Sequence, residues 1–399
     1  MKQRIKMTTC TKRKDLDVVA IYFPSWHVND HYQSWYGKGF TEWDLVKTAK
    51  PLYPGHHQPK IPSWGYFDES DPEWAAKEID LAADHGVTTF MFDWYWYGGV
   101  RIMEEALEKG FLRAPNRKRL KFAIMWANHN WGRWPAVTGV PGMSQAWSKE
   151  SAWLPVRHWL EDLDRVTDYC CEHYFSQPNY WRINDRPNFV LYDVNEFANQ
   201  LGGSEKAAAA LERMNKRAIR NGLPGLHFTA NVGCCGDNIY GCGWDRVPGV
   251  KQIGFQSVFA YNIVRTPQYP TLSNDHPIVE YGEVIKSHQY CWNQLEKGGL
   301  THHPVVTLGC DVTPRWHRDM TWPIDFRKLD HEPIIEGNTP EKFGELVRMA
   351  ICQADHNGSN PKAIFINAWN EWTEGMYLLP EKRYGTGYLE ELLRALRNA

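Results

Sequence analysis

The sequence predicts an α/β fold, a single (β/α)8 TIM barrel. Eight apolar runs recur along the 399 residues, helical patterns separate most of them, and several runs are apolar throughout instead of alternating. Such runs are typical of parallel strands that helices cover on both faces, and eight of them fit a barrel. A doubly wound sheet is the alternative. The barrel is favoured because no glycine-rich phosphate loop follows the first run.

The eight predicted strands have apolar centres and mostly polar or aromatic ends. They lie at residues 18–26, 88–96, 121–131, 187–193, 226–232, 254–262, 304–311 and 363–372. The fifth and sixth are the least distinct, because little of the sequence between them looks helical. Residues 234–250 are therefore expected to form an irregular connection.

The helix predicted at residues 73–85 has signals at both ends. Asp71 and Pro72 precede it and Gly86 follows it, which is the usual chemistry of a helix start and end. Similar signals flank residues 205–221 and 341–356, and further helices are expected at residues 102–112, 154–175 and 279–296.

One long segment, residues 27–70, follows the first strand and is rich in glycine, proline and aromatic residues. Long loops in compact domains are usually functional, so this segment is expected to wall the active-site mouth of the barrel. Residues 1–17 are expected to form an N-terminal tail, and residues 18–399 a single (β/α)8 domain, because no repeat or linker divides them.

The first residues are basic and polar without an apolar stretch, so no signal peptide is predicted in the chain as given. A cytoplasmic location is therefore expected, or a periplasmic or secreted one if the native N-terminus differs. No run approaches the length of a membrane span. With 45 basic and 47 acidic residues and no basic patch, nucleic acid is a poor candidate partner.

Aromatic residues are abundant, with 20 Trp, 19 Tyr and 16 Phe. Their flat apolar faces and polar edges suit sugars, so an oligosaccharide or polysaccharide is the expected partner, although a large core could also absorb them. The oligomeric state is not predicted. Nine cysteines in irregular spacing favour reduced thiols. No cofactor or metal is predicted, because Cys234, Cys235 and Cys242 do not follow a zinc spacing.

Two carboxylates, Glu371 and Glu374, follow the last predicted strand beside Trp369 and Trp372. Cleavage of a glycosidic bond needs one carboxyl to protonate the leaving oxygen and another to act at the sugar. A simpler explanation is that both acids lie at a helix N-terminus, where the helix dipole favours negative charge. That explanation accounts poorly for two acids flanked by two tryptophans. We therefore expect Glu371 and Glu374 to be catalytic.

In such barrels the chemistry lies at the carboxyl ends of the strands. The residues there that are expected to bind substrate are Tyr22, His27, Asp93, Trp94, Trp126, Asn128, Asn130, Asp311, Asn370 and Trp372. Each also has a structural explanation, since aspartates cap helices and tryptophans fill cores.

Six segments together resemble the WbsX-like family, which is related to glycoside hydrolase family 99. They lie at residues 22–27, 36–43, 50–59, 126–131, 311–315 and 367–375. The resemblance implies a (β/α)8 barrel that acts on carbohydrate. WbsX-like proteins are often labelled glycosyltransferases of polysaccharide loci, whereas the hydrolase relatives are endo-acting α-mannosidases. Glu42, Trp43 and Arg315, which lie in the matching segments, complete the expected substrate-binding set.

The resemblance also implies roles for the two acids. Glu371 would deprotonate the sugar 2-hydroxyl, which attacks the anomeric carbon, and Glu374 would be the general acid/base. Two positions depart from the family pattern: His129 stands where a Glu is frequent, and Leu379 replaces an acid before Pro380. Both bear on the substrate more than on the fold.

The leading hypothesis is a retaining glycoside hydrolase that acts on an α-linked glycan, with two catalytic carboxylates and possible participation of the 2-hydroxyl. A WbsX-type glycosyltransferase of polysaccharide biosynthesis is one alternative. A non-catalytic sugar-binding barrel is the other.

Overall fold

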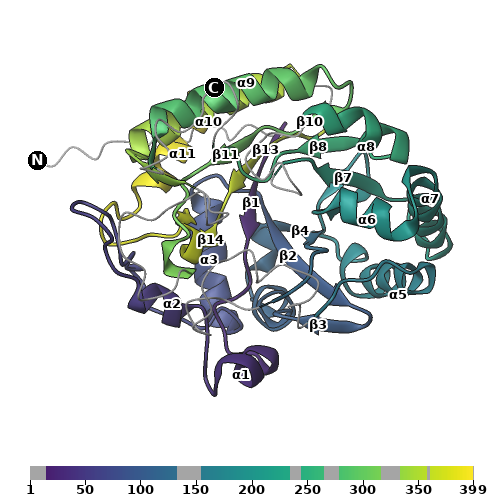
Figure 1. Cartoon of the computed structure of the whole chain (residues 1–399), viewed down its shortest axis with the longest axis horizontal. Coiled ribbons are helices and arrows are strands. Elements are labelled where there is room, and N and C mark those ends of the chain that lie inside the picture. Colours follow the sequence, from purple (N-terminus) through teal and green to yellow (C-terminus); the bar gives the residue numbers. More distant parts are fainter. Residues whose placement is uncertain are drawn as a thin grey trace, which may run out of the picture.

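The centre of the molecule is a curled, mainly parallel sheet with helices around its outside (Figure 1). The computed structural model describes residues 15–132, 154–233, 244–264, 278–315, 333–356 and 360–398. Its strands run in the order β10-β8-β7-β6-β4-β2-β1-β13-β11. The predicted class, an α/β fold built on a parallel sheet, is confirmed.

Eight of the nine strands in this order overlap the eight apolar runs of the sequence, and β10 lies outside them. The nine strands are β1 (Leu16–Tyr22), β2 (Thr89–Tyr97), β4 (Lys121–Trp126), β6 (Arg186–Leu191), β7 (His227–Asn231), β8 (Ser257–Phe259), β10 (Thr301–His302), β11 (Val305–Thr307) and β13 (Lys362–Asn367). Every residue of β1 and β2 is buried, as expected for strands covered on both faces. β1 begins at Leu16, two residues inside the predicted tail, and residues 1–14 lie outside the described residues.

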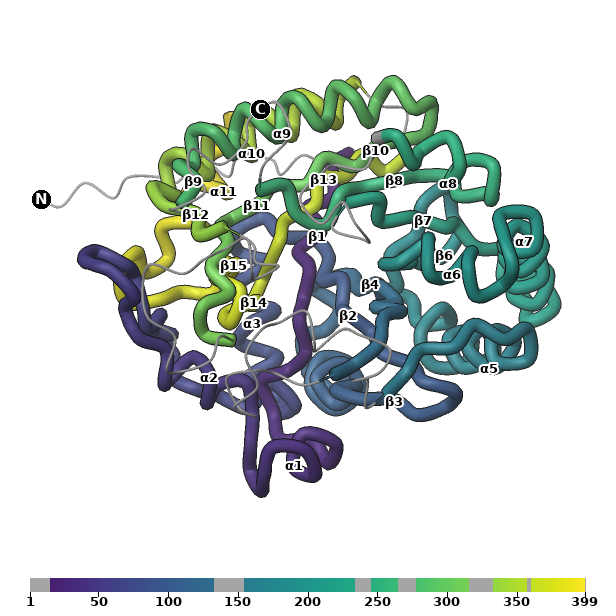
Figure 2. The backbone as a smooth tube through the Cα atoms, in the orientation of Figure 1, coloured from purple at the N-terminus to yellow at the C-terminus, as the bar shows by residue number. Residues whose placement is uncertain are grey.

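The two ends of the sheet meet at one short stretch of chain (Figure 2). β10 pairs with β8, and β11 pairs with β13, although only two residues separate β10 from β11. The N–H of His303 donates to the carbonyl of Val258 at 2.9 Å, and the carbonyl of Pro304 accepts from Phe365 at 2.8 Å. The stretch from β10 to β11 therefore draws the edges of the sheet together.

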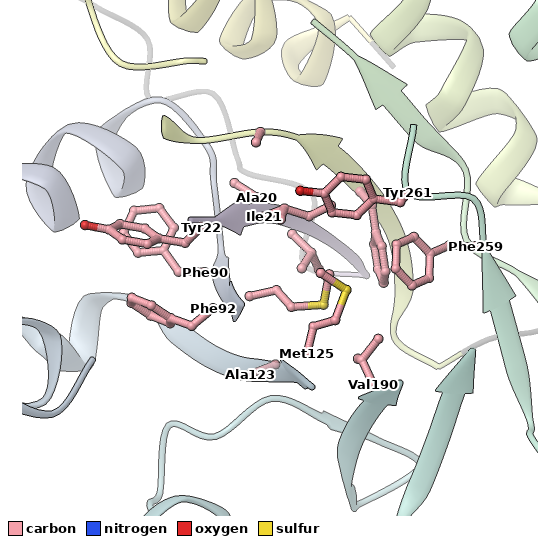
Figure 3. Packing of buried hydrophobic residues seen from close by; sticks show 14 of the residues in the cluster. Ala20, Ile21, Tyr22, Phe90, Phe92, Ala123, Met125, Val190, Phe259 and Tyr261 are labelled. Carbon is pink, nitrogen blue, oxygen red and sulfur yellow. The ribbon is translucent and has the colours of Figure 1, made fainter. Parts of the chain in front are cut away.

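The interior of the curled sheet is filled with side chains. Ile21, Met125, Val190 and Phe259, from four different strands, point toward one another there (Figure 3), and all four are fully buried. The sheet thus encloses a packed core instead of a channel, and ligand chemistry is left to the ends of the strands.

The helices outside the sheet include the three for which the sequence has signals at both ends. The longer helices are α3 (Pro72–Asp84), α5 (Leu160–Cys170), α6 (Val194–Leu201), α7 (Ser204–Arg220), α9 (Tyr281–Glu296), α10 (Pro340–Asp355) and α11 (Gly387–Arg397). Asp71 caps α3 by accepting from the N–H of Glu73 at 2.9 Å. Asp193 caps α6, which the sequence analysis did not predict, by accepting from Glu196.

The predicted helix at residues 102–112 is wrong in its first part. β3 (Val100–Ile102) pairs antiparallel with β2, and a π-helical turn (Ala106–Gly110) and a 3-10 turn (Phe111–Arg113) follow. Gly98 and Gly99 both have positive φ, 60° and 99°, as a two-residue hairpin turn requires. This glycine pair decides the local structure.

Two other predicted boundaries also differ. The helix expected at residues 154–175 begins only at Leu160, because Leu154 forms a β-bridge with Trp131. The connection expected to be irregular at residues 234–250 contains the start of α8 (Val247–Ile253), which Gly254 ends with a φ of 106°. Residues 234–243 lie outside the described part of the chain.

The long segment after β1 folds against the carboxyl ends of the strands. It contains α1 (Asp30–Tyr36) and α2 (Trp43–Thr48). The indole N–H of Trp43 donates to the carbonyl of Phe67 at 2.8 Å, and Lys60 pairs with Asp311 just beyond β11 at 3.1 Å. The first contact folds the segment on itself, and the Lys60–Asp311 pair fastens it to the end of the sheet where the site is expected.

Two remaining features are the bonding state of the cysteines and the length and hydropathy of the helices. Cys291 is disulfide-bonded, so the expectation of reduced thiols is wrong for this residue, whereas Cys170, Cys171, Cys310 and Cys352 are free. Within the ranges that the structure describes, no helix is both long and apolar enough to cross a bilayer.

Candidate active site

Glu371 and Glu374 lie on a tight hairpin directly after β13. β14 (Asn370–Glu371) pairs antiparallel with β15 (Met376–Tyr377), and a 3-10 turn (Trp372–Glu374) joins them. Gly375 closes this turn with a φ of 71°, and a Cβ at this position would lie only 2.9 Å from the Cβ of Asp311. Glycine is therefore required there, and the hairpin projects both acids from the carboxyl end of the sheet.

The guanidinium of Arg315 joins three carboxylates from distant parts of the chain. Its Nη1 pairs with Oε1 of Glu374, and its Nη2 lies 3.6 Å from Oε2 of Glu371 and 3.3 Å from Oε2 of Glu42. Burial disfavours the charge of Arg315, but the three acids outweigh this effect and raise its pKa. Because Glu371 and Glu374 contact one guanidinium, their carboxyl groups share one small space.

Glu371 is almost completely buried, with 3% of its surface exposed. The hydroxyl of Tyr261 donates to its Oε1 at 3.3 Å, while its Oε2 has no hydrogen-bond partner among the described residues. Burial, and then the charge of Glu374, raise the pKa of Glu371 well above its ordinary value, and Arg315 opposes this shift. The environment therefore favours the protonated form more than water does.

Asp93, in the middle of β2 and near the end of its pairing with β4, is a third acid in the same neighbourhood. It is buried, and its Oδ1 takes part in no hydrogen bond with the described residues. Burial, and then the charge of Glu374, raise its pKa. Asp93 also contributes to the raised pKa of Glu371. Asp93 therefore lies within electrostatic range of both Glu371 and Glu374.

Glu42 is hydrogen-bonded to the hairpin that carries the two acids. Its Oε2 accepts from the hydroxyl of Thr373 at 2.6 Å, and its Oε1 accepts from the hydroxyls of Ser25 and Tyr32, both at 3.2 Å. With Arg315 as a further partner, both oxygens of Glu42 are used inside the protein. Glu42 therefore supports the hairpin and does not face a ligand.

The predicted asparagine ligands mostly bond to the backbone. Asn370 accepts from the N–H of Phe23 at 2.7 Å and donates to its carbonyl at 2.9 Å. Asn128 makes the same pair of bonds with the backbone of Asp193, at 2.7 and 2.8 Å. Oδ1 of Asn130 accepts from the N–H of Val156. Asn370 and Asn128 therefore join neighbouring strand ends.

Tyr22 and His27 belong to a buried network on the outer side of the sheet. The hydroxyl of Tyr22 donates to Glu78 at 3.0 Å, and His27 bridges Glu69 and Glu105, each at 3.0 Å. Burial opposes the charge of His27, but the bonds to the two acids prevail and raise its pKa to about 9. These contacts use the polar atoms of both residues inside the fold.

The four predicted tryptophans are buried in the aromatic core. Trp372 stacks on Tyr377 with a centroid distance of 4.0 Å, Trp94 donates to the hydroxyl of Tyr174, and Trp43 and Trp126 are covered as well. For these rings, packing explains the positions. Asp311 is similarly engaged, because Lys60 and His56 hold its pKa far below the ordinary range in spite of its burial.

Three residues outside the predicted set lie near the acids. Tyr261 contacts Glu371, and Tyr95 is close enough to Asp93 and Glu371 for their charges to raise its pKa in addition to burial. His129 stacks on Trp131 at 5.9 Å, and burial lowers its pKa to about 4. Tyr95 follows Asp93 at a spacing of two within β2, which places both on one face of that strand, and Tyr261 follows the end of β8 at the same spacing from Phe259. That spacing is the signal that could have found both tyrosines.

Metal binding finds no support in the part of the chain that the structure describes, where no group of three or more His, Cys, Asp or Glu side chains could hold an ion. Cys234, Cys235 and Cys242 lie outside the described residues. Asp193 and Asp311 are taken up by a helix cap and by cations, respectively.

The fold is similar to that of solved glycoside hydrolase structures. The GH99 endo-alpha-mannosidase from Bacteroides thetaiotaomicron has a TM-score of 0.57 and 14% identity, with 97% of this chain and 99% of that chain covered. A structure described as a glycoside hydrolase-like protein has a TM-score of 0.56 and 15% identity, with 99% and 97% covered. At these identities the likeness shows the fold alone.

Curated relatives and a family model match nearly the whole chain. "Uncharacterized protein WxcX" of Xanthomonas campestris pv. campestris is 27% identical over 391 residues, which cover 96% of this chain and 50% of that protein. The chain thus spans about half the length of the curated relatives it matches. The family described as glycosyltransferase WbsX matches residues 18–392, and the chain belongs to this family, as the resemblance in the sequence predicted.

Proposed function

We propose that the protein is a retaining glycoside hydrolase that acts on an α-linked glycan. The observation that carries the proposal is the pair of buried carboxyl oxygens, Oε2 of Glu371 and Oδ1 of Asp93, that form no hydrogen bond with the described residues. An unsatisfied buried polar atom costs about 1–3 kcal/mol. Sugar hydroxyls can both donate and accept hydrogen bonds, so a bound sugar would satisfy both atoms.

The similarity to a GH99 endo-alpha-mannosidase supports this class of reaction. In the proposed mechanism, Glu371 takes the proton of the sugar 2-hydroxyl, whose oxygen then forms a bond to the anomeric carbon. The bond from that carbon to the leaving oxygen breaks, and Glu374 gives its proton to that oxygen. Water then attacks the anomeric carbon while Glu374 takes its proton, the bond from that carbon to the 2-oxygen breaks, and Glu371 returns its proton to that oxygen. Two successive inversions retain the anomeric configuration.

The exposures of the two acids fit these roles. The raised pKa of Glu371 makes its carboxylate a stronger base than an exposed one. The side chain of Glu374 is 20% exposed against 3% for Glu371, which gives it access to a leaving oxygen and to water. Each time Glu371 gains a proton, Glu374 loses one. The total charge beside Arg315 therefore stays constant, and no buried charge is left uncompensated.

We also propose that β10 and β11 together form the seventh strand of a (β/α)8 barrel, and that residues 18–399 are one catalytic domain. The placement of both strands at the seam of the sheet supports this. In this arrangement Asp93 is the additional acid that binds a sugar hydroxyl, while Arg315 and Glu42 hold the hairpin.

The family description favours a second function, glycosyl transfer from an activated sugar donor. The two functions differ in their ligands, because a transferase binds a nucleotide or lipid-phosphate sugar. A ligand that binds only the folded protein raises its melting temperature. Stabilisation by a nucleotide sugar, together with transfer to an acceptor and no hydrolysis, would favour the transferase.

The direct test is incubation with a panel of α-linked oligosaccharides that includes α-mannosides, followed by proton NMR. A hydrolase of the proposed type releases a product whose anomeric configuration is that of the substrate. An inverted product excludes the proposed mechanism. Saturable binding without any cleavage would instead indicate a non-catalytic sugar-binding barrel.

A further inference from the structure

A cavity of about 380 Å³ lies beside the hairpin that carries the two acids. Its walls come from residues 53–60, 308–311, 334–339 and 375–388. Gly375, the residue after Glu374, lines it, and the N–H of Asp311 donates to the carbonyl of Glu374 at 2.7 Å. The cavity and the catalytic hairpin therefore share a wall. The volume falls within the usual range of small-molecule sites, about 300–1,000 Å³.

Asp311 makes one side of the cavity rigid. Its Oδ2 accepts from His56 at 3.1 Å, Gln58 at 2.6 Å and Lys60 at 3.1 Å, and its Oδ1 accepts from the hydroxyl of Thr313 at 2.6 Å. Both oxygens are thus used, and Lys60 offsets the charge. A ligand in the cavity meets a fixed surface here and not a free carboxylate.

Tyrosine rings form much of the remaining wall. Tyr377 is held by its stacking on Trp372 at 4.0 Å, and Tyr384 packs on Tyr388 at 5.6 Å. Tyr53 stacks on the ring of His56 at 4.6 Å and donates its hydroxyl to Glu336. These rings are preorganised, so a flat ligand can be bound with little loss of side-chain freedom.

Arg383 and His57 add polar groups to this aromatic wall. The guanidinium of Arg383 lies over the ring of Tyr384, 5.1 Å from its centroid. The backbone N–H of Arg383 donates to the carboxylate of Glu381 at 2.7 Å. Burial, and then the charges of Lys60 and Arg383, lower the pKa of His57 to about 4. His57 is therefore neutral at pH 7, with one ring nitrogen that donates and one that accepts.

We propose that this cavity is a second saccharide-binding subsite beside the hairpin that carries Glu371 and Glu374. The inference rests on the function proposed above. Lys60 and Arg383 are balanced by Asp311 and Glu336 among the charged groups that line the cavity. An uncharged, hydroxylated ring therefore fits better than a phosphate or a carboxylate. Aromatic faces with polar groups beside them are the usual surroundings of such a ring. The substrate accordingly contains at least two linked sugars.

The test uses saturation-transfer NMR on the full chain with millimolar mannose, glucose, galactose, N-acetylglucosamine, rhamnose and fucose, one at a time. At least one sugar is expected to bind, and Arg383→Ala and Tyr384→Ala are each expected to weaken its binding about tenfold, since 1.4 kcal/mol is a factor of ten. Arg397→Ala, an exposed arginine on α11, is the matched control and should bind as the wild type does.

Binding of none of the six sugars overturns the proposal, and so does unchanged binding in both cavity variants. Arg383 is exposed, so Arg383→Ala folds even if Tyr384→Ala does not. The outcome is separable from catalysis. If wild type and Arg383→Ala cleave an oligosaccharide with the same KM, the proposed hydrolase activity is supported and the proposed subsite is refuted. If nothing is cleaved but Arg383→Ala loses sugar binding, the proposed subsite is supported and the proposed hydrolase activity is refuted.

Discussion

The hydroxyl of Tyr261 donates a hydrogen bond to Oε1 of Glu371 at 3.3 Å. This bond connects the residue two positions after β8 to the hairpin after β13. A hydrogen bond to a carboxylate stabilises its charged form. Tyr261 therefore partly counteracts the burial that raises the pKa of Glu371.

Tyr261→Phe removes only this hydroxyl. Without the bond, the pKa of Glu371 rises further, so the proposed base is ionised only at higher pH. We expect the acidic limb of the pH profile of kcat/KM to move upward by up to about one pH unit, since a bond of about 1 kcal/mol has this effect. An unchanged limb would show that Glu371 is not the group that titrates.

Glu371→Gln and Glu374→Gln each remove one carboxyl without a change in volume. If the acids act as base and general acid/base, each variant should lose at least about 1,000-fold in kcat, within the range of general acid–base effects. Oligosaccharide binding and the melting temperature should change little. Glu172→Gln, whose side chain is 77% exposed, is the control. Near-normal turnover of either site variant would refute the assignment.

Arg315→Ala removes the cation that three buried acids share. It leaves Glu42 and Glu371 without their counter-charge, and breaking a buried ion pair costs about 3–5 kcal/mol. We expect a loss of that order in the free energy of unfolding, measured with urea. Arg217→Ala, in a more exposed ion pair with Asp168, should cost far less. Equal losses in the two variants would contradict the central role of Arg315.

Acid should destabilise the protein well above the range where carboxylates titrate. Burial lowers the pKa of His227 to about 4 and of His302 to about 3, and it lowers that of His303 further with the help of the neighbouring histidines. The unfolded chain takes up protons near pH 6.5, but the folded one does not. The contribution of these three histidines to stability is therefore full above about pH 6.5 and is lost as the pH drops toward 4, whereas His27, whose pKa is raised, contributes most below about pH 6.5.

Urea unfolding at pH 7.5, 6 and 5 measures this slope. His303 stacks on Phe365 at 5.1 Å with nearly parallel rings, so His303→Phe should preserve the packing and show a shallower loss with acid. His173→Gln, at a half-exposed position, should keep the wild-type slope. A flat stability between pH 7.5 and 5 would disprove the expectation.

Much of the fold could be predicted because its signals are local. The apolar runs of β1 and β13 and the proline starts of α3 and α10 each depend on a few neighbouring residues. The error at residues 102–112 arose where two local signals compete. Gly98 and Gly99 indicate a hairpin, whereas the residues that follow have a helical spacing.

The site could be predicted only in part, because its chemistry depends on long-range contacts. The two acids are recognisable from their spacing and neighbours. Whether Asn370 faces a ligand or the backbone of Phe23 depends on a contact across 347 positions, which no local pattern encodes. The pairing of Arg315 with Glu42 likewise joins residues 273 positions apart.

The pairing of β1 with both β2 and β13 has a consequence for the biogenesis of the protein. One edge of β1 is soon covered by β2, but Val18 on its other edge pairs with Ile364. While the ribosome makes the intervening chain, that apolar edge is left without its partner. Late-closing edges of this kind slow folding and favour aggregation. A nascent chain of this protein should therefore depend on chaperones until β13 has emerged.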